Sequence, residues 1–345
     1  MAKLRIVPFD RAGADFVGLA RLWGAQIRHD TPQWPVYDPQ VVRDNFRVSN
    51  SAVTVCHWVG LRESVPVALL ELLLPKAPGA AAHMELIVHP KLRRRGIGSA
   101  LLRLAGRRAA SAGFTTLATV AIEPLPSGGM PRGPAGRQFC RRHGMAPVLT
   151  TVRRRLDLRE FDEERCARLD ARIAEHAAGY TVATWRDTAA DPDARALAYL
   201  HSRMSTDVPR GALPWAAMSY EPEQWRSMER MSVRRRRTTY YAGVRRGSAG
   251  ALAGYTAIML SARPREFGQQ QATIVDPLHR GHRLGLAMKL ANLRAVRRAE
   301  PRLRYIHALN ARSNTPMAAV NDALGFRPCD LAVTYQWELS DDYAG

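Results

Sequence analysis

The feature that most constrains the fold is a segment that occurs twice in the chain. The stretch VHPKLRRRGIGSALL, residues 88–102, is matched by VDPLHRGHRLGLAMK, residues 275–289. A valine, a proline, an arginine and a glycine match at a constant offset of 187 residues. Further on, HGM (143–145) matches LGF (324–326) at an offset of 181 residues. A repeat this long indicates two duplicated domains and not a solenoid of short units.

The length of the chain accommodates this duplication. The 345 residues divide into copies of roughly 150–165 residues, which is an ordinary size for one domain. An amphipathic, charged segment separates the copies, and its periodicity predicts a helix. We therefore expect an N-terminal domain at 1–155, a helical connector at 156–177 and a C-terminal domain at 178–345.

Hydrophobic patterns place strands and helices in a similar order in both halves. The first half predicts strands at residues 4–9, 51–60, 65–74, 83–90, 114–122 and 147–155. The second half predicts strands at residues 181–185, 238–244, 250–260, 270–276, 305–310 and 331–339. Helices are expected at residues 14–27, 97–112, 158–179 and 194–204, with a short helix after the Pro/Gly-rich loop at 123–136. This mixture predicts the α/β class.

Composition limits the classes of partner that we expect for this chain. The net charge is +20, and with only four lysines the basic excess is nearly all arginine. Such an excess fits a nucleic-acid or membrane-surface partner. We favour a lineage-wide preference for arginine as the cause of this excess, and expect no nucleic-acid partner.

No apolar run reaches the length of a membrane span. No secretory signal precedes the first strand, and the four cysteines lie far apart. A reducing cytoplasm without structural zinc is expected.

The repeated segment has the features of an anion site. A strand that turns into a helix leaves several backbone N–H groups unpaired, and the helix dipole favours negative charge there. Gly96 and Gly98 would let a phosphate approach the backbone closely. The spacing is neither the GxGxxG of dinucleotide-binding folds nor the GxxxxGK[ST] of a P-loop. A basic, solvated helix start is the alternative. Two copies in one register favour phosphate binding, with the arginines holding the phosphate.

At this point the chain resembles the GCN5-related N-acetyltransferases, as two tandem copies. The family signature [RQ]-x-x-G-x-[GA] is met by Arg93, Gly96 and Gly98. The second copy meets it with Arg280 and Gly285 but carries Arg283 where glycine is expected. That change makes close approach of a pyrophosphate less certain there. The resemblance implies two domains, each with a mixed, mostly antiparallel central sheet flanked by helices.

The resemblance also implies acetyl-CoA, held between two splayed strands with its carbonyl near the amide of Val88 or Val275. The first set of expected cofactor residues is Ile87, Val88, Arg93, Arg94, Arg95, Gly96, Ile97, Gly98 and Ser99. The second set is Ile274, Val275, Arg280, Gly281, His282, Arg283, Leu284 and Gly285. Asn310, Asn314 and Asn321 would line the pantetheine side of the second copy. No metal is expected, because His279 and His282 lack a third ligand nearby.

Catalysis on an amine requires a group that accepts its proton. Glu85, on the strand that leads into the first loop, is the best base in the first half. Asp207, in the loop region where the family's acceptor sits, is the candidate in the second half. Glu71 and Glu266 are weaker candidates. The tyrosine that protonates the departing thiolate in many members is replaced by Cys140 and Asn321.

The expected activity is acetyl transfer from acetyl-CoA to a primary amine of a small molecule. One copy would catalyse the reaction and the other would bind cofactor or support the fold, and the asparagines favour the C-terminal half as the catalyst. Acetylation of protein amines is the alternative enzyme. A CoA-binding or nucleic-acid-binding module without transferase activity is the alternative of another class.

Overall fold

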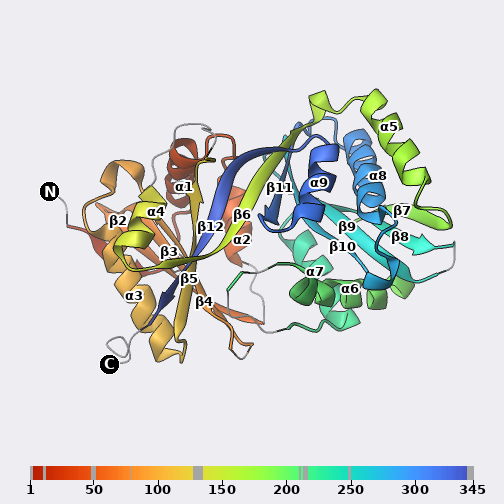
Figure 1. The fold of residues 1–345 in the computed structure, drawn as a ribbon. Helices are drawn as coiled ribbons and strands as arrows, with labels where there is room; N and C mark the ends of the chain where they lie inside the picture. The colour runs from red at the N-terminus through yellow and green to blue at the C-terminus, as the bar shows by residue number, and fades with distance from the viewer. Residues whose placement is uncertain are drawn as a thin grey trace. The chain divides into compact units, whose positions relative to one another are not determined.

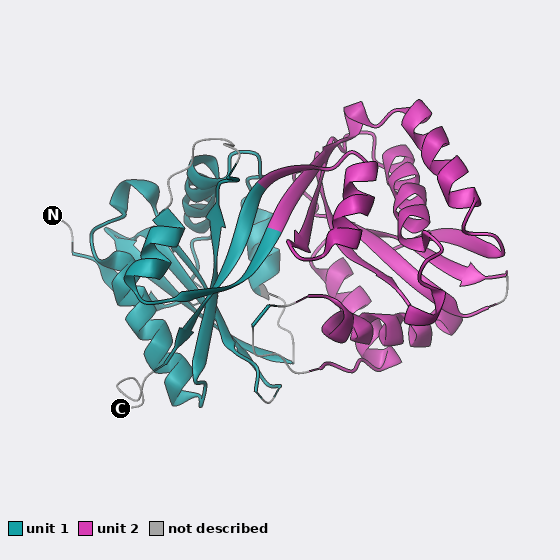
Figure 2. Cartoon of the chain, in the orientation of Figure 1, with its two compact units in different colours: residues 1–151, 210–216, 330–345 teal, residues 152–209, 217–329 magenta. Residues whose placement is uncertain are grey.

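The fold divides into two compact units. The computed structural model describes residues 3–10, 13–47, 52–77, 79–126, 135–209, 211–212, 217–247 and 250–339. Unit 1 comprises residues 1–151, 210–216 and 330–345, and unit 2 comprises residues 152–209 and 217–329 (Figure 2). Each unit places helices on both faces of a mixed sheet (Figure 1), so the predicted fold class is confirmed.

Unit 1 contains the elements of the first copy. In chain order they are β1 (Arg5–Pro8), α1 (Phe16–Asp30), α2 (Pro39–Arg47), β2 (Val53–Arg62), β3 (Val65–Pro75), β4 (Ala82–Val88), α3 (Ile97–Ser111), β5 (Thr116–Glu123), α4 (Ala135–Arg142) and the first half of β6 (Ala146–Asp157). Its strand order is β1-β2-β3-β4-β5-β12-β6. Strands β4 and β5 are parallel, and the pairs before them are antiparallel.

The apolar side chains of unit 1 form one cluster on each face of the sheet. Phe16, Leu19 and Phe46 of α1 and α2 pack against Leu69 and Ile87. On the other face, helices α3 and α4 bury residues against β3, β4 and β5. The alternation of side chains along a strand therefore assigns each position of β4 to one helical layer or the other.

Unit 2 repeats this plan. Its elements are the rest of β6, α5 (Glu163–Ala174), β7 (Tyr180–Arg186), α6 (Ala194–Asp207), α7 (Pro222–Arg234), β8 (Thr238–Arg246), β9 (Leu252–Leu260), β10 (Phe267–Val275), α8 (Leu284–Ala299), β11 (Tyr305–Ala311) and α9 (Thr315–Ala323). The strand order is β6-β11-β10-β9-β8-β7, with β10 and β11 parallel. Helices α6 and α7 cover one face, and α5, α8 and α9 cover the other.

The units do not follow the simple chain order that we predicted. The last strand, β12 (Arg327–Glu338), belongs mostly to unit 1, where residues 331–338 pair antiparallel with β5. The predicted C-terminal domain included this strand. Pairing with β5 gives β12 hydrogen-bonding partners that residue patterns along one segment do not reveal.

The connector is helical, as expected, but it is part of unit 2. Cys166 and Leu169 of α5 are buried in the unit 2 core. Arg294 of α8 forms a bidentate ion pair with Asp170, with N–O distances of 2.9 and 2.7 Å. The segment is therefore a packed helix and not a free linker.

Most predicted elements are present, with one clear omission. Helix α2 was not predicted, although Asp38 accepts a hydrogen bond from the Gln40 amide just ahead of it and Pro39 begins it. An aspartate followed by proline is a helix-start signal that could have identified it. The predicted loop at 123–136 lies largely outside the described residues.

A charged group lies in the core of unit 2. The Lys289 side chain of α8 is 1% exposed, and its Nζ donates to Oδ1 of Asn321 at 2.6 Å. The ammonium also lies 5.0 Å from the centre of the Phe326 ring. Burial lowers the pKa of Lys289 to about 7, and the charge of Arg154 adds to the effect.

This burial predicts a pH-dependent stability. Between pH 7 and 10.5 the unfolded chain keeps the Lys289 proton that the folded chain releases, so the free energy of unfolding should rise with pH. Relative to Lys289→Met, the wild type should gain on the order of 2–3 kcal/mol between pH 6 and pH 9.5. Denaturant titrations of both proteins measure this difference. A pH-independent difference would contradict the assignment.

Candidate functional site

The two repeated loops have the same backbone path. Loop 1 (residues 89–96) and loop 2 (residues 276–283) each begin with a short helical turn after a strand and end at a helix start. In both loops the second and fourth residues after the turn have positive φ. These values are 63° for Arg94 and 80° for Gly96, and 87° for Gly281 and 52° for Arg283.

Glycine and arginine have thus exchanged places between the loops. Left-handed backbone costs a residue other than glycine about 1–2 kcal/mol, and each loop has one arginine in that conformation. The expectation for Arg283 was that a pyrophosphate could approach the backbone less closely there. The turn itself is kept, because Arg283 adopts the left-handed conformation that Gly96 has in loop 1.

Both loops present unpaired main-chain amides. Within the described residues, the amides of 94–99 and of 281–285 donate to no backbone carbonyl. Helices α3 and α8 begin immediately after the loops, and no side chain caps either start. The N-terminus of a helix with free amides favours an anion. The chain therefore contains two such corners, and each has the free amides on which the prediction of an anion site depends.

Several predicted cofactor residues can contribute only their backbone. The side chains of Ile97 and Leu284 are buried in the cores of their units. Gly98 has a packing role that we did not expect, because a Cβ there would lie 3.0 Å from the ring of Phe139. A Cβ on Gly96 would meet nothing within 4 Å. Gly98 thus makes room for α4, and Gly96 provides the turn.

Arg93, which follows the short helical turn of loop 1, is hydrogen-bonded to other residues of unit 1. Nε of Arg93 donates to the carbonyl of Val88 at 3.3 Å. Its two terminal nitrogens donate to both carboxylate oxygens of Asp30, at 2.8 and 2.6 Å. Burial acts to raise the pKa of Asp30, but hydrogen bonds from Arg93, His29 and Gln26 outweigh it, so the pKa is lowered.

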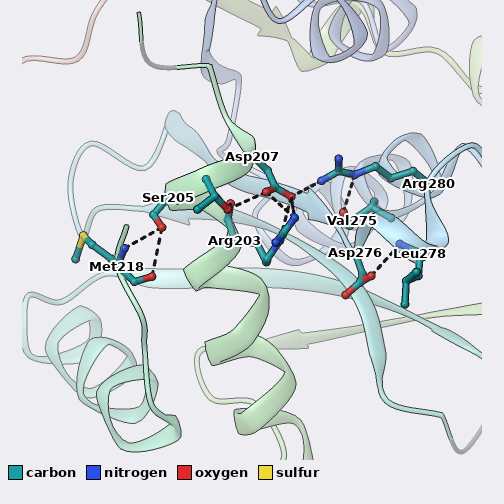
Figure 3. Close-up of polar contacts among 9 residues, drawn as sticks. Arg203, Ser205, Asp207, Met218, Val275, Asp276, Leu278 and Arg280 are labelled. Carbon is teal, nitrogen blue, oxygen red and sulfur yellow. Dashed lines mark hydrogen bonds and ion pairs between the residues drawn. The ribbon is translucent and has the colours of Figure 1, made fainter. Parts of the chain in front are cut away.

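Loop 2 repeats this arrangement (Figure 3). Nε of Arg280 donates to the carbonyl of Val275 at 3.2 Å, and its guanidinium forms an ion pair with Asp207 at the end of α6. Arg203 donates to the same carboxylate. We call the arrangement in each unit the arginine clasp: Arg93 with Val88 and Asp30, and Arg280 with Val275 and Asp207.

The clasp corrects two expectations. Arg93 and Arg280 were expected to hold phosphate, but their guanidinium groups are already bound to carboxylates. Asp207 was expected to be a base. Its side chain is 8% exposed. Burial acts to raise the pKa of Asp207, but hydrogen bonds from Thr206, Arg280 and Arg203 outweigh this effect, so the pKa is lowered. Asp207 is therefore a poor proton acceptor.

The remaining cations differ between the loops. Arg94 and Arg95 of loop 1 are exposed. In loop 2, Nδ1 of His282 donates to the carbonyl of His176 at 3.1 Å, and Arg283 donates to the carbonyl of Arg172 at 3.4 Å. Those carbonyls lie at the C-terminal end of α5, where the helix dipole is negative. Loop 2 therefore directs the side chains of His282 and Arg283 toward α5.

Loop 2 is tied to the sheet as well. The Tyr180 hydroxyl lies 2.9 Å from Nδ1 of His279, and the Tyr180 ring packs against His279 and His282. His282 was among the expected cofactor residues. Among the described residues, no group of His, Cys, Asp and Glu could hold a metal ion.

A row of polar side chains crosses the sheet of unit 1. Glu71 lies opposite Glu85 on β3 and β4, and His57 lies opposite Glu71 on β2. Nε2 of His57 is 2.7 Å from Oε2 of Glu71. We call these residues the carboxylate row. They lie on the α1/α2 face, since Leu69 and Ile87, two residues along the same strands, pack there.

Glu85 has the proton affinity of a neutral-pH base. The Glu85 side chain is partly open to solvent, and the protein around it lowers the solvation of its charged form. Burial raises the pKa of Glu85 to about 7, and the charge of Glu71 adds to the effect. Glu85 was the sequence candidate for a base in this half and Glu71 a weaker one. His57 was not considered.

Unit 2 has no such row. The corresponding register positions hold Tyr241 on β8, Ala257 on β9 and the irregular Gln271–Ala272 segment of β10. Trp225 and Tyr255, which are 3% and 1% exposed, fill the α6/α7 face beside them. Burial lowers the pKa of His201 to about 4, and its Nδ1 lies 2.8 Å from the Tyr255 hydroxyl. This face is a packed core.

The asparagines expected to line a cofactor have structural roles. Asn321 is 1% exposed, accepts from Lys289 and donates to Oδ1 of Asn310 at 3.1 Å. Asn314 caps α9 by accepting from the Met317 amide at 3.2 Å. A buried lysine needs a hydrogen-bond partner, and these asparagines provide one. The spacing of these asparagines in the sequence did not distinguish a cofactor contact from a structural role.

The position of the missing tyrosine is buried. Cys140 is 2% exposed, and burial raises the pKa of its thiol to about 12. Tyr335 of β12 packs in the same cluster and donates to Glu123 at 2.7 Å. Burial raises the pKa of Tyr335 to about 12, with the Glu123 hydrogen bond as the next cause.

The clasps predict a stability contribution from each aspartate. Asp30→Asn and Asp207→Asn each remove the charge that holds an arginine, at a cost of about 1–2 kcal/mol. Because the pKa of each aspartate is lowered by folding, the contribution should vanish as the pH falls through that lowered pKa. Denaturant midpoints at pH 7 and at acid pH measure the loss. Midpoints equal to wild type at pH 7 would refute the structural role.

No helix in the described ranges is both long enough and apolar enough to cross a membrane.

Comparison with curated proteins found no match. The family model described as the acetyltransferase (GNAT) family matches residues 19–125.

Solved structures match over nearly the whole chain. A tandem GNAT protein from the clavulanic acid biosynthesis pathway is 30% identical with a TM-score of 0.82, and the match covers 98% of this chain and 99% of that one. A GCN5-related N-acetyltransferase from Sphaerobacter thermophilus is 14% identical with a TM-score of 0.64, covering 97% and 96%. The second likeness concerns the fold alone. The first, together with the repeated strand–loop–helix corner, shows that the chain belongs to the GCN5-related N-acetyltransferase (GNAT) family as a tandem member.

Proposed function

We propose that this protein transfers an acetyl group from acetyl-CoA to a primary amine of a small molecule, and that unit 1 carries out the chemistry. The observation that carries the proposal is the position of Glu85. It lies on the strand that leads into loop 1, and burial raises its pKa to about 7. The C-terminal half, which the asparagines favoured, has no carboxylate on the equivalent strand β10.

The residues of unit 1 fit the cofactor. Loop 1 offers the amides of residues 94–99 to a diphosphate, and the exposed Arg94 and Arg95 add positive charge. The parallel pairing of β4 with β5 runs from Ala82 to Met84 and leaves the rest of β4 unpaired on that side in the described residues. The two strands therefore diverge before loop 1.

The Val88 amide is available at this divergence. The next amide, of His89, donates to Val67 on β3. Amides alternate in direction along an antiparallel strand, so the Val88 amide points toward β5. When bound, acetyl-CoA supplies the acetyl group as a thioester. The Val88 amide is the donor that β4 offers to a carbonyl oxygen in this gap.

Glu85 would accept a proton from the acceptor. An alkyl amine has a pKa of about 10.4 and reacts only when neutral. A solvated glutamate would be too weak a base at neutral pH, whereas a carboxyl with a pKa of about 7 is half deprotonated and accepts a proton readily. Glu85 is thus suited to convert an ammonium group to the neutral amine.

The class of acceptor is inferred from the likeness. The 30% identical tandem protein comes from the biosynthesis pathway of clavulanic acid, which is a small molecule. That origin favours a small-molecule amine over a protein amine. Unit 2 would serve as a scaffold, because its α6/α7 face is filled and loop 2 directs its cations toward α5.

Replacement of Glu85 tests the chemistry. Glu85→Gln keeps the shape but cannot accept the proton, so kcat/KM should fall by about 10²–10⁴-fold. In the wild type, kcat/KM should rise with pH through about pH 7 as Glu85 loses its proton. Thiol release from acetyl-CoA with an amine panel measures both. Glu164→Gln, on the exposed surface of α5, should behave as wild type, and an active Glu85→Gln protein would exclude Glu85 as the base.

Calorimetry tests which loop binds the cofactor. Residues Arg95 and His282 occupy the same position in the two loops. We expect one acetyl-CoA per chain, bound at least about tenfold more weakly by Arg95→Glu, since one charge contact to phosphate is worth about 1.5–3 kcal/mol. His282→Glu should bind as wild type. Two sites per chain, or weakening by the His282 variant alone, would contradict the assignment to unit 1.

A further inference from the structure

Two glutamates directly opposite on neighbouring strands are unusual. Like charges in a cross-strand pair destabilise a sheet, yet Glu71 and Glu85 are aligned on β3 and β4. His57 stands on the far side of Glu71 and is hydrogen-bonded to it. The row therefore runs from a histidine that is 6% exposed, through a glutamate that is 26% exposed, to the exposed Glu85.

The aromatic surroundings fix the histidine. The His57 ring packs against Phe46 of α2, with centroids 4.4 Å apart, and against Phe9 at 5.9 Å. A ring held in this way cannot turn to follow a moving partner. Its Nε2 lies 2.7 Å from Oε2 of Glu71, and this hydrogen bond orients the Glu71 carboxylate.

We propose that His57 and Glu71 are positioning residues: His57 holds the Glu71 carboxylate beside Glu85, and the Glu71 charge adds to burial in making Glu85 the acceptor of the substrate's ammonium proton. The inference rests on the proposed function of unit 1 and goes beyond it. A carboxylate next to a fixed negative charge binds a proton more strongly than one in water. The proton moves from the substrate nitrogen to a Glu85 oxygen, and the nitrogen keeps the electron pair that attacks the acetyl group.

Within the described ranges, no other charged group accounts for the state of Glu85. His83, two residues earlier on the same face of β4, has its pKa lowered by burial and is neutral at pH 7. On α1 the Asp30 carboxylate is held by Arg93, and on α2 Asp44 accepts from Gln40. Strand β5 presents the uncharged Ala118 and Val120 next to this part of β4. Glu71 is the charge that acts on Glu85.

The second unit supports a functional origin of the row. Unit 2 retains the clasp and the loop path but has Ala257 where Glu71 stands. A sheet of this plan therefore folds without the carboxylate. Retaining two adjacent carboxylates in unit 1 costs stability, and catalysis is a reason to keep them.

The test compares Glu71→Gln with His57→Phe in the full chain. Glutamine can still accept from His57 but carries no charge, so the Glu85 titration should move to lower pH by about one unit. Phenylalanine removes the donor, so Glu71 and Glu85 would share a proton and the titration should move to higher pH. Glu63→Gln is the control, because Glu63 lies in the turn between β2 and β3 and its charge is away from the row. This variant should leave the titration of Glu85 unchanged.

Two readouts separate this inference from the proposed function. Carbon-13 NMR of the Glu85 carboxyl measures its titration without any reaction, and the pH profile of kcat/KM measures its use. We expect the NMR titration and the pH profile to move to lower pH in Glu71→Gln and to higher pH in His57→Phe. We also expect a higher melting temperature for Glu71→Gln. An unmoved Glu85 titration in both variants would overturn the inference while leaving transfer intact. Shifts in NMR without shifts in the rate profile would exclude the row from catalysis. Full activity of Glu85→Gln would instead contradict the proposed function.

Discussion

The ion pair between an arginine and a helix-terminal aspartate organises each unit. Arg93 connects the carbonyl at the end of β4 with Asp30 at the end of α1, and Arg280 makes the same connection to Asp207. The arginine is thereby held in an extended conformation, with ψ of 161° and 166° in the two loops. The next residues must then turn through positive φ to reach the helix, and their amides are left facing outward. The strained turn and the unpaired amides together are the features that favour an anion at this corner.

The two units use this frame differently. Unit 1 leaves its loop cations exposed and carries carboxylates on the strand before the loop. Unit 2 directs the side chains of His282 and Arg283 to carbonyls at the C-terminal end of α5 and fills the equivalent face with aromatic rings. Its core also buries Lys289 with two asparagines. The backbone of the corner is thus retained in both copies, while the side chains that would serve chemistry are concentrated in one.

Local sequence patterns predict the elements that depend on local interactions. The repeat gave the strand, turn and helix start of both loops, because glycine content and hydrophobic period are properties of neighbouring residues. Partners distant in the chain could not be read in this way, so Asp30 and Asp207 were not recognised as partners of the arginines. The His57–Glu71 pair depends on one irregularity. With an unbroken hairpin from the Glu63–Ser64 turn, His57 would face Leu70, but a register shift at Gly60 and Leu61 brings it opposite Glu71. The pairing of β12 with β5 is equally invisible to local patterns.

A crystal structure of the protein grown with acetyl-CoA tests the central claim most directly. The diphosphate should lie within hydrogen-bonding distance of the amides of residues 94–99, with the thioester in the gap beside β4 and the acetyl group on the side of Glu85. Arg93 should remain paired with Asp30. A cofactor bound at loop 2 alone, or a diphosphate held by Arg93 after the Asp30 pair has opened, would contradict the account.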